Sequence, residues 1–274
     1  MRKKQKLDMT ASEKKIFVIM AVTTVVAALL CVFAWYINDF YCATEKAETA
    51  ILGNELISVT EHNKYYVFEL IEESNAQVTN TENHSNADIE KTEEKNTKKG
   101  IIFYPGGKVE EIAYAPLMLE FAEYGYEVYL VKMPMKLAIF GMNRAEDIMA
   151  KASHIEEWTM MGHSLGGAMA ASFSASHDEE VEALVLLAAY STEDLKKLDI
   201  EVYSFYGSED KVLNMEKYEE YHSNFPEDVI EEVIDGGNHA NYAHYGAQDG
   251  DGEATITREE QQECVLDVFL SVGK

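Results

Sequence analysis

The distribution of hydrophobic positions separates a long uncharged segment near the N-terminus from a region of short, alternating apolar runs. Residues 16–37 carry no charged side chain, whereas basic residues crowd positions 1–15. A helix over residues 16–37 would be roughly 33 Å long, which is enough to cross a bilayer. The basic flank predicts that residues 1–15 stay in the cytoplasm and that the rest of the chain lies outside it.

A cleaved secretion signal is the alternative interpretation of residues 16–37. The apolar run is long for the hydrophobic part of such a signal, and no convincing small-x-small cleavage site follows it. We therefore expect an uncleaved transmembrane anchor that contacts the lipid bilayer. A short helical stalk over residues 38–50 and a folded domain over residues 51–274 are expected after it.

The folded domain alternates strand-like and helix-like patterns. Strands are expected at residues 55–60, 64–70, 101–104, 126–131, 158–161, 183–189, 201–206 and 229–234. Helices are expected at residues 113–124, 144–152, 164–176, 215–221 and 257–270. Such alternation predicts an α/β fold in which helices cover both faces of a mostly parallel sheet. The connection after the strand at 183–189 is too short for a large cap domain, so we expect an open site.

A polar stretch at residues 72–99 interrupts this pattern. Val78 and Ile89 are its only aliphatic residues beyond alanine, and Asn, Thr, Glu and Lys dominate it. A segment of this composition cannot bury enough apolar surface to offset the entropy lost on ordering. We therefore expect a mobile surface loop at 72–99.

The run Gly162-His163-Ser164-Leu165-Gly166-Gly167 lies between an expected strand and an expected helix. In that setting G-x-S-x-G forms a nucleophile elbow, in which a serine on a sharp turn stands at the N-terminus of a helix. Glycines allow the strand and the helix to pass closely. Ser164 is therefore the candidate nucleophile, and a glycine-rich turn that happens to hold a serine is the simpler alternative.

A serine hydroxyl needs a general base, and the base needs a group that holds its tautomer. In the elbow architecture the chain order is serine, acid, histidine. Asp210 follows the strand at 201–206 and His239 follows the strand at 229–234, so they are the candidate acid and base. Glu209 is an alternative acid, and His163 is expected to shape the turn beside the serine.

An oxyanion hole requires two convergent N–H donors. The N–H of Leu165, the residue after the nucleophile, is the first candidate. The N–H of Gly107, in the glycine pair after the strand at 101–104, is the second. A tight turn without a catalytic role is the alternative interpretation of this glycine pair.

Charge and cysteine content limit the partners. The chain has 49 acidic and 23 basic residues and a net charge of −26, which would repel phosphate backbones and excludes nucleic acid as an expected partner. Cys42 and Cys264 could pair outside a membrane, but the sequence leaves this open. Residues 249–260 approach a calcium-loop spacing, yet Ala254 stands where the turn glycine is required. We expect no metal and no cofactor.

Four stretches of the sequence resemble one bacterial group of the α/β-hydrolase superfamily, the dienelactone-hydrolase-like "fold-5" type. They are FYPGGKVE at 103–110, VKMPMKLAIFGMN at 131–143, GGNHAN at 236–241 and DGDGEATITREEQQ at 249–262. Many members of this group are membrane-anchored. The resemblance implies catalytic roles for Ser164, Asp210 and His239, and it implies no particular substrate.

We therefore expect a membrane-tethered serine hydrolase that cleaves an ester or related acyl bond of a small-molecule substrate through an acyl-enzyme. Two alternatives stay open. The first is a non-catalytic binding protein on a hydrolase fold, because a fold does not determine function. The second is an acyltransferase that uses the same three residues.

Overall fold

The computed structural model describes residues 10–71 and 98–272 and divides the chain into two compact units, residues 1–40 and 41–274. The first nine residues of the expected cytoplasmic segment lie outside the described residues. Almost all of the expected mobile loop at 72–99 lies outside them too. Its last residue, Lys99, is described and opens a strand.

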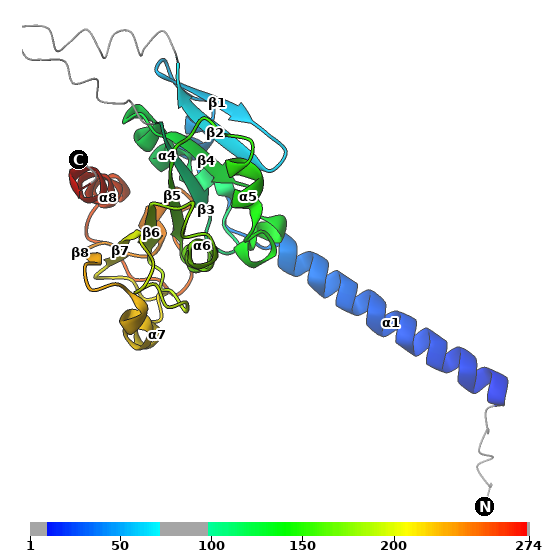
Figure 1. Ribbon diagram of the computed structural model, residues 1–274. Helices are drawn as coiled ribbons and strands as arrows, with labels where there is room; N and C mark the ends of the chain where they lie inside the picture. The colour runs from blue at the N-terminus through cyan, green and yellow to red at the C-terminus, as the bar shows by residue number, and fades with distance from the viewer. Residues whose placement is uncertain (1–9, 72–97, 273–274) are drawn as a thin grey trace, which may run out of the picture. The chain divides into compact units, whose positions relative to one another are not determined.

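The N-terminal unit contains one long helix, α1 (Ala11–Asn38) (Figure 1). Thr10 and Glu13 form a reciprocal capping box at its start, in which each side chain accepts a hydrogen bond from the other residue's backbone N–H. Residues Ala11–Tyr36 are long and apolar enough to cross a membrane, judged by length and composition. The large apolar side chains along α1 are exposed among the described residues.

The second unit is built on an eight-stranded sheet with the strand order β1-β2-β4-β3-β5-β6-β7-β8. The strands are β1 (Ile57–Glu61), β2 (Tyr65–Leu70), β3 (Lys99–Tyr104), β4 (Glu127–Val131), β5 (Glu157–His163), β6 (Ala183–Leu187), β7 (Glu201–Gly207) and β8 (Ile230–Ile234). The β1–β2 and β2–β4 pairs are antiparallel, and all other pairs are parallel. The predicted mostly parallel α/β sheet is thus confirmed.

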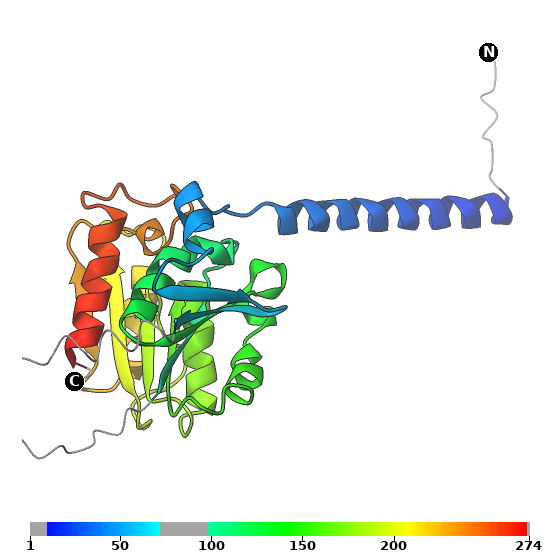
Figure 2. The same cartoon turned by 90° about the horizontal axis from the view of Figure 1, so that it is seen from above.

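Helices cover both faces of this sheet (Figures 1 and 2). They are α2 (Glu45–Ala50), α4 (Ala115–Glu123), α5 (Arg144–Met149), α6 (Leu165–Ser176), α7 (Met215–Tyr221) and α8 (Arg258–Val272), with short 3₁₀ helices η1 (Glu111–Tyr114), η2 (Pro134–Lys136), η3 (Ala138–Phe140), η4 (His222–Asn224) and η5 (Ala240–Tyr242). Successive side chains of a strand point to opposite faces. Accordingly, Phe103 packs in one core with α4 and α8, and Ile102 packs in the other with α5, α6 and α7.

The start of the folded unit differs from the prediction. We expected residues 38–50 to form a stalk outside the domain, whereas the compact unit begins at Tyr41. Tyr41 forms a β-bridge with Val109, and Ala47 of α2 is fully buried. Residues 41–50 pack on the folded unit through contacts with residues far along the chain. The segment is too short for its hydrophobic pattern to predict these contacts.

Candidate active site

Ser164 occupies the single position between β5 and α6, at the carboxyl end of the sheet. Its backbone has φ 52° and ψ −122°, a strained conformation for a residue with a side chain. The N–H of Ser164 donates to the carbonyl of Leu187 on the neighbouring strand at 2.9 Å, and the carbonyl of Ser164 accepts from Ala168 in α6 at 3.1 Å. These bonds hold a partly exposed serine in the geometry of a nucleophile elbow.

The glycines around Ser164 are required by close backbone contacts. A Cβ atom at Gly162 would lie 2.6 Å from the backbone of Gly166. A Cβ atom at Gly166 would lie only 2.0 Å from the carbonyl oxygen of Tyr104, at the end of β3. The elbow therefore closes only because these two positions have no side chain, and β3 approaches the start of α6 for the same reason.

Asp210 and His239 form a buried hydrogen-bonded pair. His239 Nδ1 lies 2.8 Å from Asp210 Oδ2, and the two side chains are 2% and 0% exposed, respectively. The other carboxylate oxygen, Oδ1, accepts the N–H groups of Val212 and Leu213, both at 2.8 Å. Of the two acidic candidates, Asp210 rather than Glu209 is therefore the one that meets His239.

The His239 loop also reaches the elbow. The ring of His163, the residue before Ser164, lies 4.5 Å from the ring of His239 between centroids. Within the described part of the chain, no hydrogen bond joins the Ser164 hydroxyl to His239. Hydrogen bonds between catalytic groups are often long before substrate binds. The structure thus brings the base to the neighbourhood of the serine, and their direct contact stays a prediction.

The two residues predicted to supply the oxyanion N–H groups lie next to one another. A Cβ atom at Gly107 would lie 3.2 Å from Leu165 Cδ2. Leu165 is the first residue of α6, so its N–H has no acceptor within the helix. The N–H of Gly107 meets no acceptor among residues 10–71 and 98–272, whereas the N–H of Gly106 donates to the Tyr114 hydroxyl at 3.0 Å.

Comparison with known proteins places this arrangement in a family. Residues 100–263 match the alpha/beta hydrolase family. The chain belongs to the alpha/beta hydrolase family. The matched region contains the elbow, the Asp210–His239 pair and both expected oxyanion donors. Among curated proteins, none matches the sequence of this alpha/beta hydrolase.

Solved structures share the fold of this alpha/beta hydrolase at low sequence identity. A predicted CIB-like hydrolase from Thermoplasma acidophilum has a TM-score of 0.54 and 16% identity, over 79% of this chain and all of its own. An alpha/beta hydrolase from the metagenome of lagoon sediments at Mar Chica, Morocco, has a TM-score of 0.53 and 15% identity, over 79% of this chain and 99% of its own. Carboxylesterase CesB from Bacillus subtilis has a TM-score of 0.52 and 11% identity, over 83% of this chain and 96% of its own.

His163 links the elbow of the hydrolase domain to the loop after β3. Its Nδ1 lies 2.7 Å from the hydroxyl of Tyr114, which also accepts the N–H of Gly106. Burial holds the pKa of His163 well below 6.5, and the neighbouring His239 adds to this. His163 is therefore neutral at ordinary pH. The contact between Tyr114 and His163 could not be predicted from the sequence, because 49 residues separate the two along the chain.

Asp251 is a second residue that sequence reasoning missed in this hydrolase. Its Oδ2 accepts the N–H of Ala240 at 2.9 Å, and its Oδ1 accepts those of Gly252 at 2.8 Å, His239 at 3.3 Å and Lys211 at 3.4 Å. One carboxylate thus ties the loop that carries the acid to the loop that carries the histidine. The sequence suggested only a calcium-like spacing for this region, and the acidic motif at 249–262 was the available signal.

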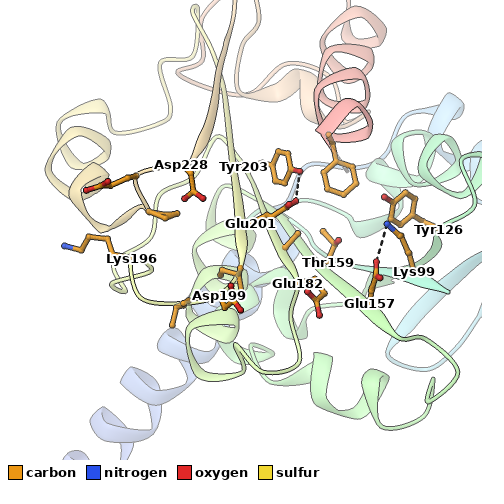
Figure 3. Close-up of a pocket in the computed structure, with 16 residues that line it drawn as sticks. Lys99, Tyr126, Glu157, Thr159, Glu182, Lys196, Asp199, Glu201, Tyr203 and Asp228 are labelled. Carbon is orange, nitrogen blue, oxygen red and sulfur yellow. Dashed lines mark hydrogen bonds and ion pairs between the residues drawn. The ribbon is translucent and has the colours of Figure 1, made fainter. Parts of the chain in front are cut away.

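A cavity of about 1110 Å³ lies at the opposite end of the sheet (Figure 3). Residues at the starts of several strands line it, and an ion pair joins Lys99 to Glu157 at 3.2 Å. The Tyr203 hydroxyl donates to Glu201 at 2.9 Å. Because Ser164 lies at the carboxyl ends of the strands, this cavity is separate from the candidate active site of the hydrolase.

Proposed function

We propose that this chain is a membrane-tethered serine hydrolase that cleaves ester or related acyl bonds. Ser164 attacks the acyl carbonyl, and His239 accepts the serine proton and delivers it to the leaving group. Asp210 holds the tautomer of His239. Water then attacks the acyl-enzyme with His239 as the general base. The observation that carries the proposal is the buried Asp210–His239 pair beside a serine in a strained elbow.

The oxyanion that forms on the substrate would be held by the N–H groups of Leu165 and Gly107. The adjacency of the residues Gly107 and Leu165 supports this assignment, and the first turn of α6 adds a favourable dipole. The reaction needs no cofactor, since serine, histidine and a carboxylate supply the nucleophile and the proton transfers. An ester substrate is further supported by the fold shared with a carboxylesterase.

The tether is proposed to be α1, with the basic N-terminal residues in the cytoplasm and residues 41–274 outside it. The length and apolar character of Ala11–Tyr36 support a span. The sequence stretches at 103–110 and 236–241 support membership of the dienelactone-hydrolase-like group. Protection of the C-terminal unit from added protease in sealed vesicles of known orientation tests the topology.

Loss of Ser164 tests the chemistry most directly. We expect Ser164→Ala to lower hydrolysis of a short p-nitrophenyl ester by about 10⁴-fold or more, because its nucleophile is gone. Ser172→Ala, the same substitution within the helix α6 that follows Ser164, should keep the wild-type rate. Equal rates for the wild type and Ser164→Ala would overturn the assignment.

Two further measurements separate this function from its alternatives. A fluorophosphonate probe should label the wild type and should not label Ser164→Ala. Failure to label folded wild-type protein would instead indicate a binding protein on a hydrolase fold. Preferential formation of a new ester or amide, when an alcohol or amine is added, would indicate acyl transfer from the same acyl-enzyme.

A further inference from the structure

The segment that leaves the apolar helix is bonded directly to the loop beside the candidate oxyanion hole. The N–H of Tyr41 donates to the carbonyl of Lys108 at 2.8 Å, and the carbonyl of Tyr41 accepts the N–H of Glu110 at 2.9 Å. Gly107, the proposed oxyanion donor, is the residue before Lys108. The first residue of the folded unit is therefore attached at the edge of the active site.

The chain between the apolar helix and this attachment is very short. The helix α1 ends at Asn38, three residues before Tyr41. Even when fully extended, three residues can span at most about 11 Å. This limit depends only on the number of residues between the helix and Tyr41. If α1 crosses a bilayer, the loop around Lys108 must lie close to the surface from which the helix emerges.

An exposed apolar rim continues from this loop, formed by residues 135–140. The N–H of Lys108 donates to the carbonyl of Lys136 at 2.7 Å, and Leu137 Cδ2 would lie 3.7 Å from a Cβ atom at Gly107. The side chains of Ile139 and Phe140 are 58% and 56% exposed. Large apolar side chains so exposed beside a site mark a surface for an apolar partner.

The charges around the rim favour a membrane surface as that partner. Residues 132–144 carry Lys132, Lys136 and Arg144 and no acidic side chain, within a chain of net charge −26. Lys132 pairs with Glu61 at 2.5 Å and Lys136 pairs with Glu111 at 3.1 Å, so the charges of these two lysines are partly balanced. Basic side chains that flank exposed apolar ones are typical of segments that rest in the headgroup region of a bilayer.

We propose that the rim at residues 135–140 rests on the bilayer that α1 crosses, and that the substrate is an amphiphilic ester with a long acyl chain, taken from that leaflet. This inference rests on the proposed function for the identity of the site, and on α1 as a membrane span. Beyond the proposed function, it specifies that the candidate active site faces the bilayer and that its substrate is a long-chain ester. The acyl chain would enter past Ile139 and Phe140, with its ester carbonyl at Ser164.

A fluorescence experiment tests the orientation. The full chain, with Cys31, Cys42 and Cys264 replaced by serine, is reconstituted in vesicles of phosphatidylethanolamine and phosphatidylglycerol. Phe140→Cys and Tyr124→Cys are each labelled with an environment-sensitive nitrobenzoxadiazole probe. Tyr124 is the matched control, because it is 64% exposed and follows α4 at the amino end of the sheet.

We expect the probe at position 140 to emit at shorter wavelength and to be quenched by spin-labelled lipid, while the probe at position 124 reports water. Water-like emission at both positions would overturn the proposal. So would equal quenching at both, which indicates no preferred face. Thermal unfolding of each variant shows that the cysteine replacements preserve the fold.

A rate ratio tests the substrate class. We expect Phe140→Ser to lower the rate on a long-chain ester in the vesicle, relative to a soluble acetate ester, by about tenfold, which corresponds to about 1.4 kcal/mol of lost anchoring. Tyr124→Ser should leave the ratio unchanged. An unchanged ratio in Phe140→Ser, with both rates abolished in Ser164→Ala, would refute this inference and leave the proposed hydrolase standing. Immersion of position 140 without Ser164-dependent hydrolysis would refute the hydrolase instead.

Discussion

Asp251 gives the sharpest test of how the site is held together. Asp251→Asn keeps the size of the side chain and removes its charge, and one of its two oxygens becomes an NH₂ group. If the remaining oxygen keeps the place of Oδ1, the new NH₂ faces the N–H of Ala240, which now donates to Oδ2 at 2.9 Å. Two donors then oppose each other next to His239.

The magnitude follows from the bonds that are lost. A hydrogen bond to a charged acceptor contributes about 1.5–3 kcal/mol, and Asp251 is partly exposed, so we expect a loss of about 2 kcal/mol in the free energy of unfolding. For a chain of this size, that corresponds to a fall in melting temperature of roughly 4–8 °C. A shift of His239 by about 1 Å would lower kcat by up to about 100-fold.

The assay is ester hydrolysis at a temperature where all variants are folded, together with thermal unfolding. Glu253→Gln is the matched control, because it removes one charge from the same segment at an exposed position. The proton on His239 Nδ1, which lies between the ring and Asp210, should also shift in the NMR spectrum of Asp251→Asn and not in that of Glu253→Gln. If Asp251→Asn lowers kcat no more than Glu253→Gln does, Asp251 does not position the histidine.

Three other expectations concern the acid, the elbow and buried histidine. Asp210→Asn should lower kcat by about 10⁴-fold with an unchanged circular dichroism spectrum, since His239 loses the charge that faces Nδ1; a loss below tenfold would assign the orienting role elsewhere. Gly166→Ala places a methyl group 2.0 Å from the Tyr104 carbonyl oxygen, so we expect little folded protein by circular dichroism, and a normal melting temperature would contradict the packing described for the elbow. Burial lowers the pKa of His244 from 6.5 to about 4. Between these values the unfolded chain binds a proton that the folded chain excludes, so the free energy of unfolding should fall by up to about 1.4 kcal/mol per unit as the pH decreases from 6.5 to 4. Urea unfolding of the wild type and His244→Asn at pH 7 and pH 5 measures this, and an identical pH dependence in the two proteins would count against it.

The features that the sequence predicted well depend on local requirements. The elbow needs a strand, a serine between small residues and a helix, all within a few positions of Ser164, so the pattern is readable without any distant contact. The alternation of strands and helices predicted the parallel sheet for the same reason. Asp210 and His239 could be chosen because the carboxyl ends of parallel strands meet at one edge of the sheet.

The features that the sequence did not predict depend on contacts between distant segments. Tyr114 is hydrogen-bonded to His163, and Asp251 is hydrogen-bonded to the His239 loop. The hydrophobic periodicity of the sequence does not predict either contact. Tyr41 was assigned to a stalk because a single β-bridge to Val109 leaves no repeating pattern. Each of these contacts joins segments that are far apart along the chain, so the local pattern around each residue carries no sign of its partner.

The bridge between Tyr41 and Val109 sets a limit on how the chain can be shortened. A soluble version that began at Ile51 would lack the strand partner of residues 108–110 and the buried α2, and would expose apolar surface that both now cover. A version that began at Tyr41 would keep them. If α1 spans a membrane as proposed, a protease that released the intact folded unit would have to cut between Asn38 and Tyr41. A later cut would remove the strand partner of the loop that carries the candidate oxyanion donor Gly107.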